Sequence, residues 1–228
     1  MGVMKYKNIL FDFDGTLADT REGIVRTVQG TLERMGLAPA APADIVKTIG
    51  LPLTECFRRA TTTPESRIEE AAQVYRDIFP LLALDHITPF DGVLHTLADL
   101  RSRGIVMAIA SSRHHISLDP LVEQLGISRH IPLSQVYGED ERLRPKPAPD
   151  LALSILQGMN LQASETLVVG DTIYDLMMGS AAGCHTCGVT YGNQSREQLA
   201  TATPDHIIDH LPALLSLIDQ MEAGLSNE

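Results

Sequence analysis

Basic and aromatic residues are scarce in this 228-residue chain, and tryptophan is absent. Lysine and arginine total 18 against 29 acidic residues, so the formal net charge is −11, and aromatic residues make up 4%. Nucleic acids and anionic membranes attract basic patches, and stacking on bases requires aromatic side chains. We therefore expect neither nucleic acid nor a membrane as the main partner.

Long apolar runs and a cysteine framework are also missing. The longest uninterrupted apolar run, Ile105 to Ala110, is far shorter than the roughly 20 residues that cross a bilayer. The first residues contain no apolar stretch of the kind found in a signal peptide. Three cysteines suit a reducing compartment better than a disulfide scaffold, so we expect a cytoplasmic protein.

Short apolar runs that stop at small or acidic residues recur along the chain and predict buried strands. Segments with helical spacing separate them, and 44% of the chain is hydrophobic, which is enough for a core. Nearly continuous apolar strands are typical of a parallel sheet with helices on both faces. The pattern predicts an α/β fold with a Rossmann-like, doubly wound core, whose strands are residues 7–11, 105–110, 166–169, 186–190 and 206–208.

The segment from residue 19 to about 86 has a different pattern. Apolar residues between Ile24 and Met35 recur at helical spacing, and Thr63–Pro64 predicts the start of a helix that runs toward Phe79. No strand is predicted there, and a structureless loop of this length is improbable. We expect an all-helical cap domain of residues 17–86, inserted into a core of residues 1–16 and 87–228.

Acidic and polar side chains follow three of the predicted strands. Asp12 and Asp14 follow the first strand, Ser111 the second and Asp171 a later one. Ligands of parallel α/β sheets bind at the carboxyl ends of the strands. We therefore expect these four side chains to lie along one edge of the sheet.

Asp175 and Lys146 complete this set. Asp175 lies four residues after Asp171, in the first turn of a predicted helix, and prolines on both sides of Lys146 can hold it at a helix start. Four carboxylates in one place repel each other, and one lysine cannot balance them. Oxygen-only ligands favour Mg²⁺ over Zn²⁺, so the set predicts Mg²⁺ together with a phosphate or similar anion.

Several segments resemble the motifs of the haloacid dehalogenase superfamily, and the similarity covers nearly the whole chain. They are residues 11–17, Ser111, residues 146–150 and 170–175, with further similarity at 179–183 and 191–192. The helical insertion resembles the cap of the subgroup that contains phosphoglycolate phosphatases and β-phosphoglucomutases. The resemblance implies a Mg²⁺-dependent phosphatase that acts on a small phosphorylated metabolite.

The resemblance also implies a role for each motif residue. Asp12 is the nucleophile that forms an aspartyl-phosphate, and Asp14 is first the general acid and then the base. The ligands of Mg²⁺ are Asp12, the main-chain carbonyl of Asp14, Asp171 and, directly or through water, Asp175. The phosphate-binding residues are Thr16, which also orders its loop, Ser111, Ser112 and Lys146.

Other residues bear on the substrate. Asp14 favours phosphoryl transfer, because dehalogenases of the superfamily lack this second acid. Ile24 stands where β-phosphoglucomutases carry a cap histidine, so a phosphatase is favoured over a phosphohexomutase. Gly50 and Leu51 resemble the specificity loop of phosphoglycolate phosphatases and related pyrophosphatases, and Arg58 lies near enough to meet a substrate carboxylate. Phosphoglycolate is the first candidate substrate, ahead of pyrophosphate, nucleotide monophosphates and sugar phosphates.

The segment after Ser111 departs from the family pattern. Ser112–Arg113 stands where asparagine is common, which bears on the substrate and not on the chemistry. His114 and His115 follow, and we expect them at the surface or at a helix start, with a place at the mouth of the site as the alternative.

A non-enzymatic alternative is a receiver-like signalling module, which also combines a phospho-accepting aspartate, a hydroxyl and a lysine around Mg²⁺. A receiver is about half this length and carries no helical insertion after its first strand. Turnover therefore separates the two interpretations.

Two patterns have an ordinary structural interpretation. The apolar stripe between Leu211 and Met221 predicts a helix packed on the sheet; contact with a second copy is the alternative, so we expect a monomer or a weak homodimer. Cys184 and Cys187 form a CxxC pair without a second pair of metal ligands, so we expect structural cysteines.

Overall fold

A six-stranded parallel sheet forms the centre of the computed structural model, which describes residues 6–225, with side chains as far as Met221. Residues 1–5 of the predicted core lie outside the described residues. The strand order is β5-β4-β1-β6-β7-β8. The strands are β1 (Asn8–Phe11), β4 (Val106–Ala110), β5 (Val136–Tyr137), β6 (Thr166–Gly170), β7 (His185–Val189) and β8 (His206–Ile208).

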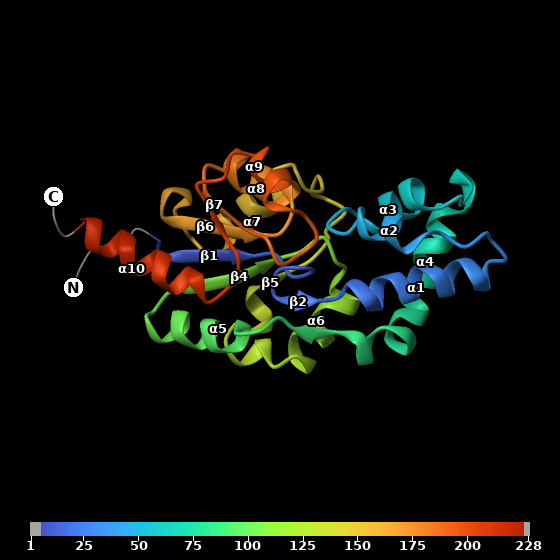
Figure 1. The fold of residues 1–228 in the computed structure, drawn as a ribbon, viewed down its shortest axis with the longest axis horizontal. Coiled ribbons are helices and arrows are strands. Elements are labelled where there is room, and N and C mark those ends of the chain that lie inside the picture. The colour runs from blue at the N-terminus through green and yellow to red at the C-terminus, as the bar shows by residue number, and fades with distance from the viewer. Residues whose placement is uncertain (1–5, 226–228) are drawn as a thin grey trace.

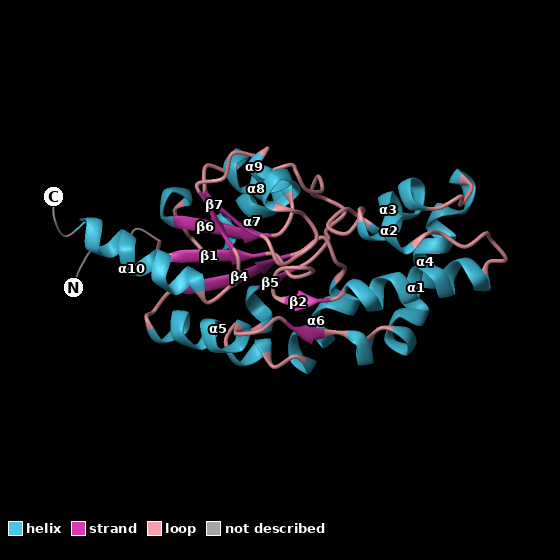
Figure 2. Cartoon of the chain, in the orientation of Figure 1, coloured by secondary structure: helices cyan, strands magenta, loops and turns pink. Residues whose placement is uncertain are grey.

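Helices flank this sheet (Figures 1 and 2). They are α5 (Val93–Ser102), α6 (His115–Gln124), α7 (Asp150–Gly158), α8 (Ile173–Ala181), α9 (Arg196–Ala200) and α10 (Ala213–Leu225). Short 3₁₀ turns cover Glu65–Arg67, Leu84–His86, Ile127–Arg129, Leu133–Gln135 and Ala163–Glu165. Within residues 6–225, every helix is too short or too polar to span a membrane.

The side chains of β1 alternate between two apolar cores, one on each face of the sheet. Ile9 and Phe11 belong to the larger core, to which α5, α6 and α10 contribute. Leu10 belongs to the smaller core, to which α7 and α8 contribute. Because successive strand residues point to opposite faces, a sheet covered on both sides needs apolar residues throughout. The predicted α/β class with a doubly wound parallel sheet is confirmed.

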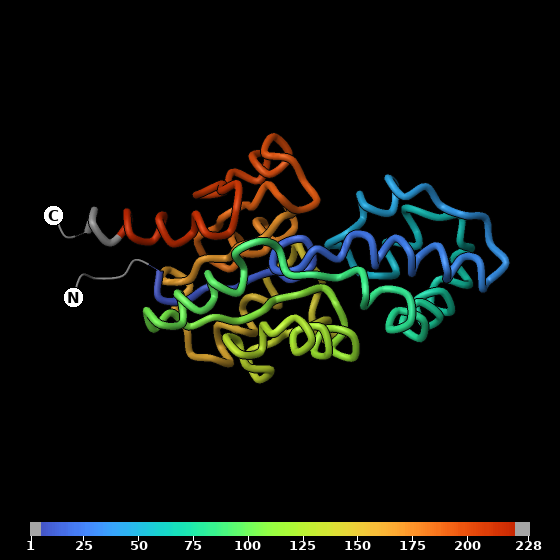
Figure 3. Tube along the Cα trace, turned by 60° about the horizontal axis from the view of Figure 1, so that its bottom comes forward, coloured from blue at the N-terminus to red at the C-terminus, as the bar shows by residue number. Residues whose placement is uncertain are grey.

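Four helices form a block beyond the sheet: α1 (Arg21–Arg34), α2 (Pro42–Val46), α3 (Leu53–Ala60) and α4 (Ile68–Leu82) (Figures 1 and 3). The chain enters and leaves this block through a two-stranded antiparallel ribbon of β2 (Ala18–Asp19) and β3 (Thr88–Pro89). The division into a core of residues 1–16 and 87–228 and a cap of residues 17–86 stays a prediction.

Some element boundaries differ from the sequence expectation. The helix expected at Thr63–Pro64 begins at Ile68, after a 3₁₀ turn. The helix expected from Pro147 begins at Asp150, because proline restricts the residue before it and lacks an N–H. The strands β2, β3 and β5 were not predicted, since each has two residues, too few to show a period.

The C-terminal stripe packs on the sheet as expected. Leu211, Leu214 and Ile218 are fully buried in the larger core. The cysteine prediction also holds, because Cys184 and Cys187 are buried free thiols. Burial raises the pKa of Cys184 to about 11 and that of Cys187 to about 12, so neither thiol is activated.

Candidate active site

Three carboxyl groups meet at the ends of two neighbouring strands. Asp12 directly follows β1, Asp171 directly follows β6, and Asp175 lies in the first turn of α8. One oxygen of each lies within 4.8 Å of the others. The two strands are parallel and in register, so their carboxyl ends coincide. The structure thus brings together three of the acids that the sequence placed at this edge.

Lys146 is buried against this cluster. Its ammonium group donates to Asp12 Oδ1 at 2.7 Å, to Asp175 Oδ1 at 2.6 Å and to the carbonyl of Ala110 at 2.7 Å. All three N–H donors of the lysine are therefore used within the protein. A phosphoryl oxygen at Lys146, as expected from the sequence, has to replace or share one of these bonds.

The cluster carries more negative charge than its surroundings balance. Burial raises the pKa of Asp12 well above its usual value, and Asp175 and Asp171 add to this while Lys146 opposes it. Burial and then Asp175 raise the pKa of Asp171 to about 7. Burial lowers the pKa of Lys146, but its two carboxylate partners outweigh that effect and raise it. Both carboxyl pKa values are raised first by burial, and the neighbouring acids add to the effect.

These residues fit a hard divalent cation. Three buried carboxylates face a single buried ammonium group, and the donor atoms are all oxygen, which suits Mg²⁺. Asp12, Asp171 and Asp175 are the side chains that can hold it. The Asp14 side chain is outside this group; its main-chain carbonyl stays a predicted ligand.

Asp171 is held by residues from two loops. The main-chain N–H and the side-chain amide of Asn193 donate to its Oδ2 at 2.6 and 2.8 Å, and Thr16 donates to its Oδ1 at 3.4 Å. Gly15 has φ +89°, and a Cβ there would lie 2.2 Å from Asp171 Oδ2, so this turn requires glycine. Asn193 was not predicted, although the family similarity at residues 191–192 ends directly before it.

Thr16, predicted as a phosphate ligand, has the contacts of a residue that orders the loop. Besides donating to Asp171, its carbonyl accepts from the hydroxyl of Tyr191 at 2.8 Å. Ser111 differs: it is buried, and its Oγ accepts from the N–H of Arg113 at 3.1 Å, which leaves its own proton free for a phosphoryl oxygen.

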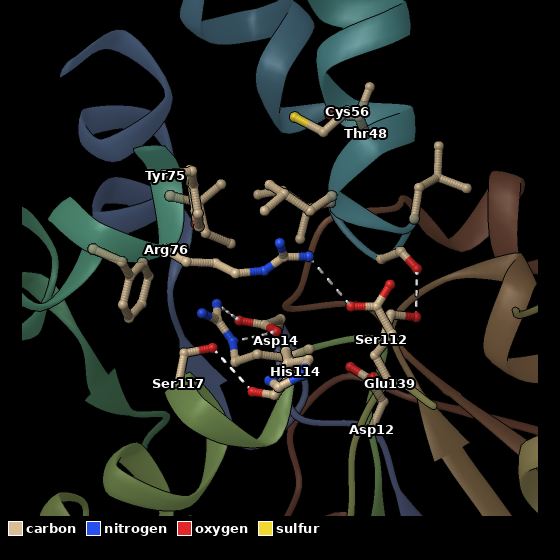
Figure 4. Close-up of a pocket in the computed structure, with 17 residues that line it drawn as sticks. Asp12, Asp14, Thr48, Cys56, Tyr75, Arg76, Ser112, His114, Ser117 and Glu139 are labelled. Carbon is tan, nitrogen blue, oxygen red and sulfur yellow. Dashed lines mark hydrogen bonds and ion pairs between the residues drawn. The ribbon is translucent and has the colours of Figure 1, made fainter. Parts of the chain in front are cut away.

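Asp14 has a partner that the sequence analysis did not assign. Arg113 donates from Nη2 to Asp14 Oδ1 at 2.6 Å and from Nε to Oδ2 at 3.1 Å, a bidentate pair visible in Figure 4. The Arg113 side chain is 7% exposed. Burial lowers the pKa of Arg113, but Asp14 and then Tyr75 outweigh that effect and raise it. The departure from the family pattern at residue 113 therefore affects the predicted acid itself.

Arg113 also joins the core to the helical block. Its guanidinium lies 4.6 Å from the centre of the Phe79 ring on α4. Ser112 Oγ donates to the carbonyl of Gly50 at 3.1 Å, and Arg76 on α4 lies 4.0 Å from Glu139. Asp14 is thus connected to the helical block through one arginine.

Two cavities reach the site. We call the one lined by Asp12 and Asp14 the inner cavity and the one lined by Ser111 and Lys146 the outer cavity. The inner cavity is lined by Asp12, Asp14, Gly50, Leu51 and Arg113 among others, and its volume is about 80 Å³. Ser112 and Glu139 line both cavities, while Ser111, Lys146 and Arg58 line only the outer cavity. His114 lines the inner cavity as well as capping α6, so its predicted helix-start role and the alternative at the mouth are both seen.

Arg58 and the predicted loop residues Gly50 and Leu51 line different cavities. Arg58 faces the outer cavity and donates to Glu55 at 2.7 Å and to Glu65 at 2.9 Å. Its guanidinium is partly exposed and already paired on both sides. Contact of Arg58 with a substrate carboxylate stays a prediction, and the structure gives this arginine other partners.

Comparisons with known proteins agree with this architecture. The model of the haloacid dehalogenase-like hydrolase family matches residues 9–189. A 5′-nucleotidase from Pseudomonas aeruginosa is 33% identical over 95% of this chain and 97% of its own length. A phosphoglycolate phosphatase from Yersinia pestis is 32% identical over 93% of each chain. The crystal structure described as a predicted phosphoglycolate phosphatase from Haemophilus somnus has a TM-score of 0.86 and 22% identity, and the match covers 95% of this chain and 99% of that one.

Proposed function

The chain belongs to the haloacid dehalogenase-like hydrolase family and is a phosphatase of that family, and from this premise we propose that it hydrolyses a small phosphomonoester through a phosphorylated Asp12. The two relatives act, by their names, on 5′-nucleotides and on phosphoglycolate. The family alone therefore leaves the alcohol part of the substrate open. The family resemblance implies the roles of nucleophile and acid, and this chain's own geometry supports them.

In the first step, a carboxylate oxygen of Asp12 attacks phosphorus as the bond from phosphorus to the alcohol oxygen breaks. Asp14 gives its proton to that oxygen, and the alcohol leaves. In the second step, Asp14 takes a proton from water, the water oxygen bonds to phosphorus, and the bond from phosphorus to Asp12 breaks. Phosphate leaves, and both carboxyl groups return to their starting state.

The neighbouring residues position these groups. Arg113 orients the Asp14 carboxyl group through its two bonds, Lys146 holds Asp12, and Ser111 donates to a phosphoryl oxygen. Asp12, Asp171 and Asp175 would hold Mg²⁺, which would supply positive charge against the phosphoryl oxygens. The β2–β3 ribbon joins the helical block to the core, and we place the hinge of cap closure there.

The observation that carries this proposal is that Asp12 and Asp14 face one cavity with different partners. Asp12 is bonded to Lys146 beside the other two carboxyl groups, whereas Asp14 is bonded to Arg113. Two carboxyl groups with different electrostatic surroundings suit the separate roles of nucleophile and proton donor.

The test is phosphate release from a panel of phosphomonoesters, with Mg²⁺ and with EDTA. We expect many turnovers per enzyme with Mg²⁺ and none with EDTA. A single labelling event without turnover would support the receiver-like alternative instead. Conversion of one sugar phosphate isomer to another without release of phosphate would support the mutase alternative.

A further inference from the structure

Phe79, an aromatic residue of the helical block, lies against the arginine that holds Asp14. The Arg113 guanidinium lies over the Phe79 ring, with its central carbon 4.6 Å from the ring centre. At its edge, the same guanidinium donates two hydrogen bonds to the Asp14 carboxyl group, at 2.6 and 3.1 Å. A planar cation that is bonded at its edge and covered on its face has little freedom to turn. The ring therefore restricts the direction in which Arg113 presents its two donors.

The main chain of Arg113 is fixed by the core. Its N–H donates to Ser111 Oγ at 3.1 Å, and its carbonyl accepts from the N–H of Glu139 at 2.9 Å. Ser111 follows β4 and Glu139 follows β5, so both partners are placed by strands of the central sheet. The sheet thus sets the position of the Arg113 main chain, and α4 contributes to the direction of its side chain.

The Phe79 ring is itself held by aromatic neighbours. Tyr75 lies one turn earlier on α4, with its ring centre 5.7 Å from that of Phe79, and Phe57 on α3 has its ring centre 6.3 Å from that of Tyr75. All three side chains are buried. The surface that meets Arg113 is therefore a packed part of the helical block, and packed interiors shift little.

The arrangement suits Asp14 in both of its proposed protonation states. The carboxylate that takes a proton from water can accept both bonds from Arg113. The protonated form of the first step keeps an acceptor oxygen for Arg113, while its O–H group is available to the leaving oxygen. Arg113 can thus hold the direction of the Asp14 carboxyl group in both steps. Misdirection of such a group is costly in rate, even over a small distance.

We propose that Phe79 is a positioning residue of the reaction, which acts on Asp14 through Arg113. The inference rests on the function proposed above, because it needs Asp14 as the general acid and base. Its consequence is that Asp14 is correctly directed only while α4 lies against the core. Phe79 was not among the site residues predicted from the sequence, because its contact with Arg113 joins two distant segments of the chain.

Two substrates that differ in their need for an acid test the inference. The alcohol oxygen of benzyl phosphate has to be protonated as it leaves, whereas the phenolate of p-nitrophenyl phosphate is weakly basic and leaves without a proton. Each substrate carries one aromatic ring, so the two are similar in size. The value of kcat/KM covers the steps up to release of the alcohol. The ratio of kcat/KM for benzyl phosphate over p-nitrophenyl phosphate therefore measures how well Asp14 is directed as an acid.

In Phe79→Leu we expect this ratio to fall about tenfold, because leucine keeps the position apolar but offers no ring face to Arg113. Phe79→Met is the second variant in case Phe79→Leu does not fold, which circular dichroism will show. Phe57→Leu is the matched control, because Phe57 is equally buried in the helical block and does not line the inner cavity. The control should keep the native ratio. An unchanged ratio in the folded Phe79 variants overturns the inference.

A double-mutant comparison separates action through Arg113 from direct contact with the substrate. In the Arg113→Ala background, Phe79→Leu should change the ratio by less than about twofold, because the group through which Phe79 acts is gone. Phe79 also lines the inner cavity. If the ratio falls as far in the Arg113→Ala background as in the native one, Phe79 contacts the substrate itself and the inference is wrong.

The variant Asp14→Asn separates the inference from the proposed function. If Asp14→Asn keeps the native ratio, Asp14 is not the acid, and the proposed function and the inference fail together. If Asp14→Asn lowers the ratio while Phe79→Leu does not, the proposed function stands and only the positioning role of Phe79 is wrong.

Discussion

The two ends of the candidate site handle charge in opposite ways. At the strand ends, three buried carboxyl groups surround one buried ammonium group, and the excess negative charge calls for a cation. In the inner cavity, Arg113 is paired with Asp14 and Arg76 lies beside Glu139 amid apolar side chains. The first end suits the phosphoryl chemistry, which the family shares. The second end suits the alcohol, which differs among relatives.

The largest predicted effect lies at the strand ends. Asp12→Asn removes the nucleophile while keeping its shape, and we expect kcat to fall by about 10⁴-fold or more. Circular dichroism should show a folded protein. The matched control is Asp91→Asn, at an exposed aspartate before α5, with unchanged kcat. Substantial Mg²⁺-dependent turnover in the folded Asp12→Asn variant would refute the nucleophile role.

The second prediction compares the removal of a buried cation, Lys146, with the removal of a partly exposed one, Arg58. Lys146→Met leaves Asp12 and Asp175 buried without their counter-charge, so we expect the free energy of unfolding to fall by about 3–5 kcal/mol. Arg58→Met breaks partly exposed pairs with Glu55 and Glu65, which water screens, so we expect a much smaller loss than in Lys146→Met. Urea denaturation without Mg²⁺ measures both. Equal losses would contradict the assignment of Lys146 as the counter-charge of the cluster.

A third prediction concerns the connection between the two ends. Arg113→Lys keeps a cation but cannot form the bidentate bond, so we expect kcat to fall about 10- to 100-fold through poorer orientation of Asp14. KM should change less than kcat, and Arg113→Ala should lose more than the lysine variant. An Arg113→Lys enzyme with normal kcat and raised KM would instead indicate that Arg113 binds the substrate.

The smallest predicted effect is in the loop that supports the cluster. Tyr191→Phe removes the hydrogen bond from the tyrosine hydroxyl to the carbonyl of Thr16. We expect a loss of about 1 kcal/mol in unfolding free energy and a change in kcat of less than about threefold. A loss of kcat as large as that in Arg113→Lys would show that this loop takes part directly in positioning the nucleophile.

The sequence predicted the central strands well, because a strand buried on both faces needs an uninterrupted apolar run. It also placed Asp12, Asp171 and Asp175 together, since the ends of parallel strands meet at one edge of a sheet. It was weaker where two residues sufficed to form a strand, as in the β2–β3 ribbon. It was weakest for Asn193 and for the partner of Asp14, because no local pattern marks a contact between residues far apart in the chain.

The sequence by itself thus determined the strands of the sheet and the chemical character of the residues that follow them. Both depend on short apolar runs and their flanking residues, which are local patterns that recur along the chain. Only the tertiary structure decided that Arg113 pairs with Asp14 and lies on Phe79, that Arg58 and Gly50 line different cavities, and that the wall of the inner cavity is mainly apolar. These features depend on how the helical block packs against the core. That packing is set by the combined contacts of many distant side chains rather than by any short segment.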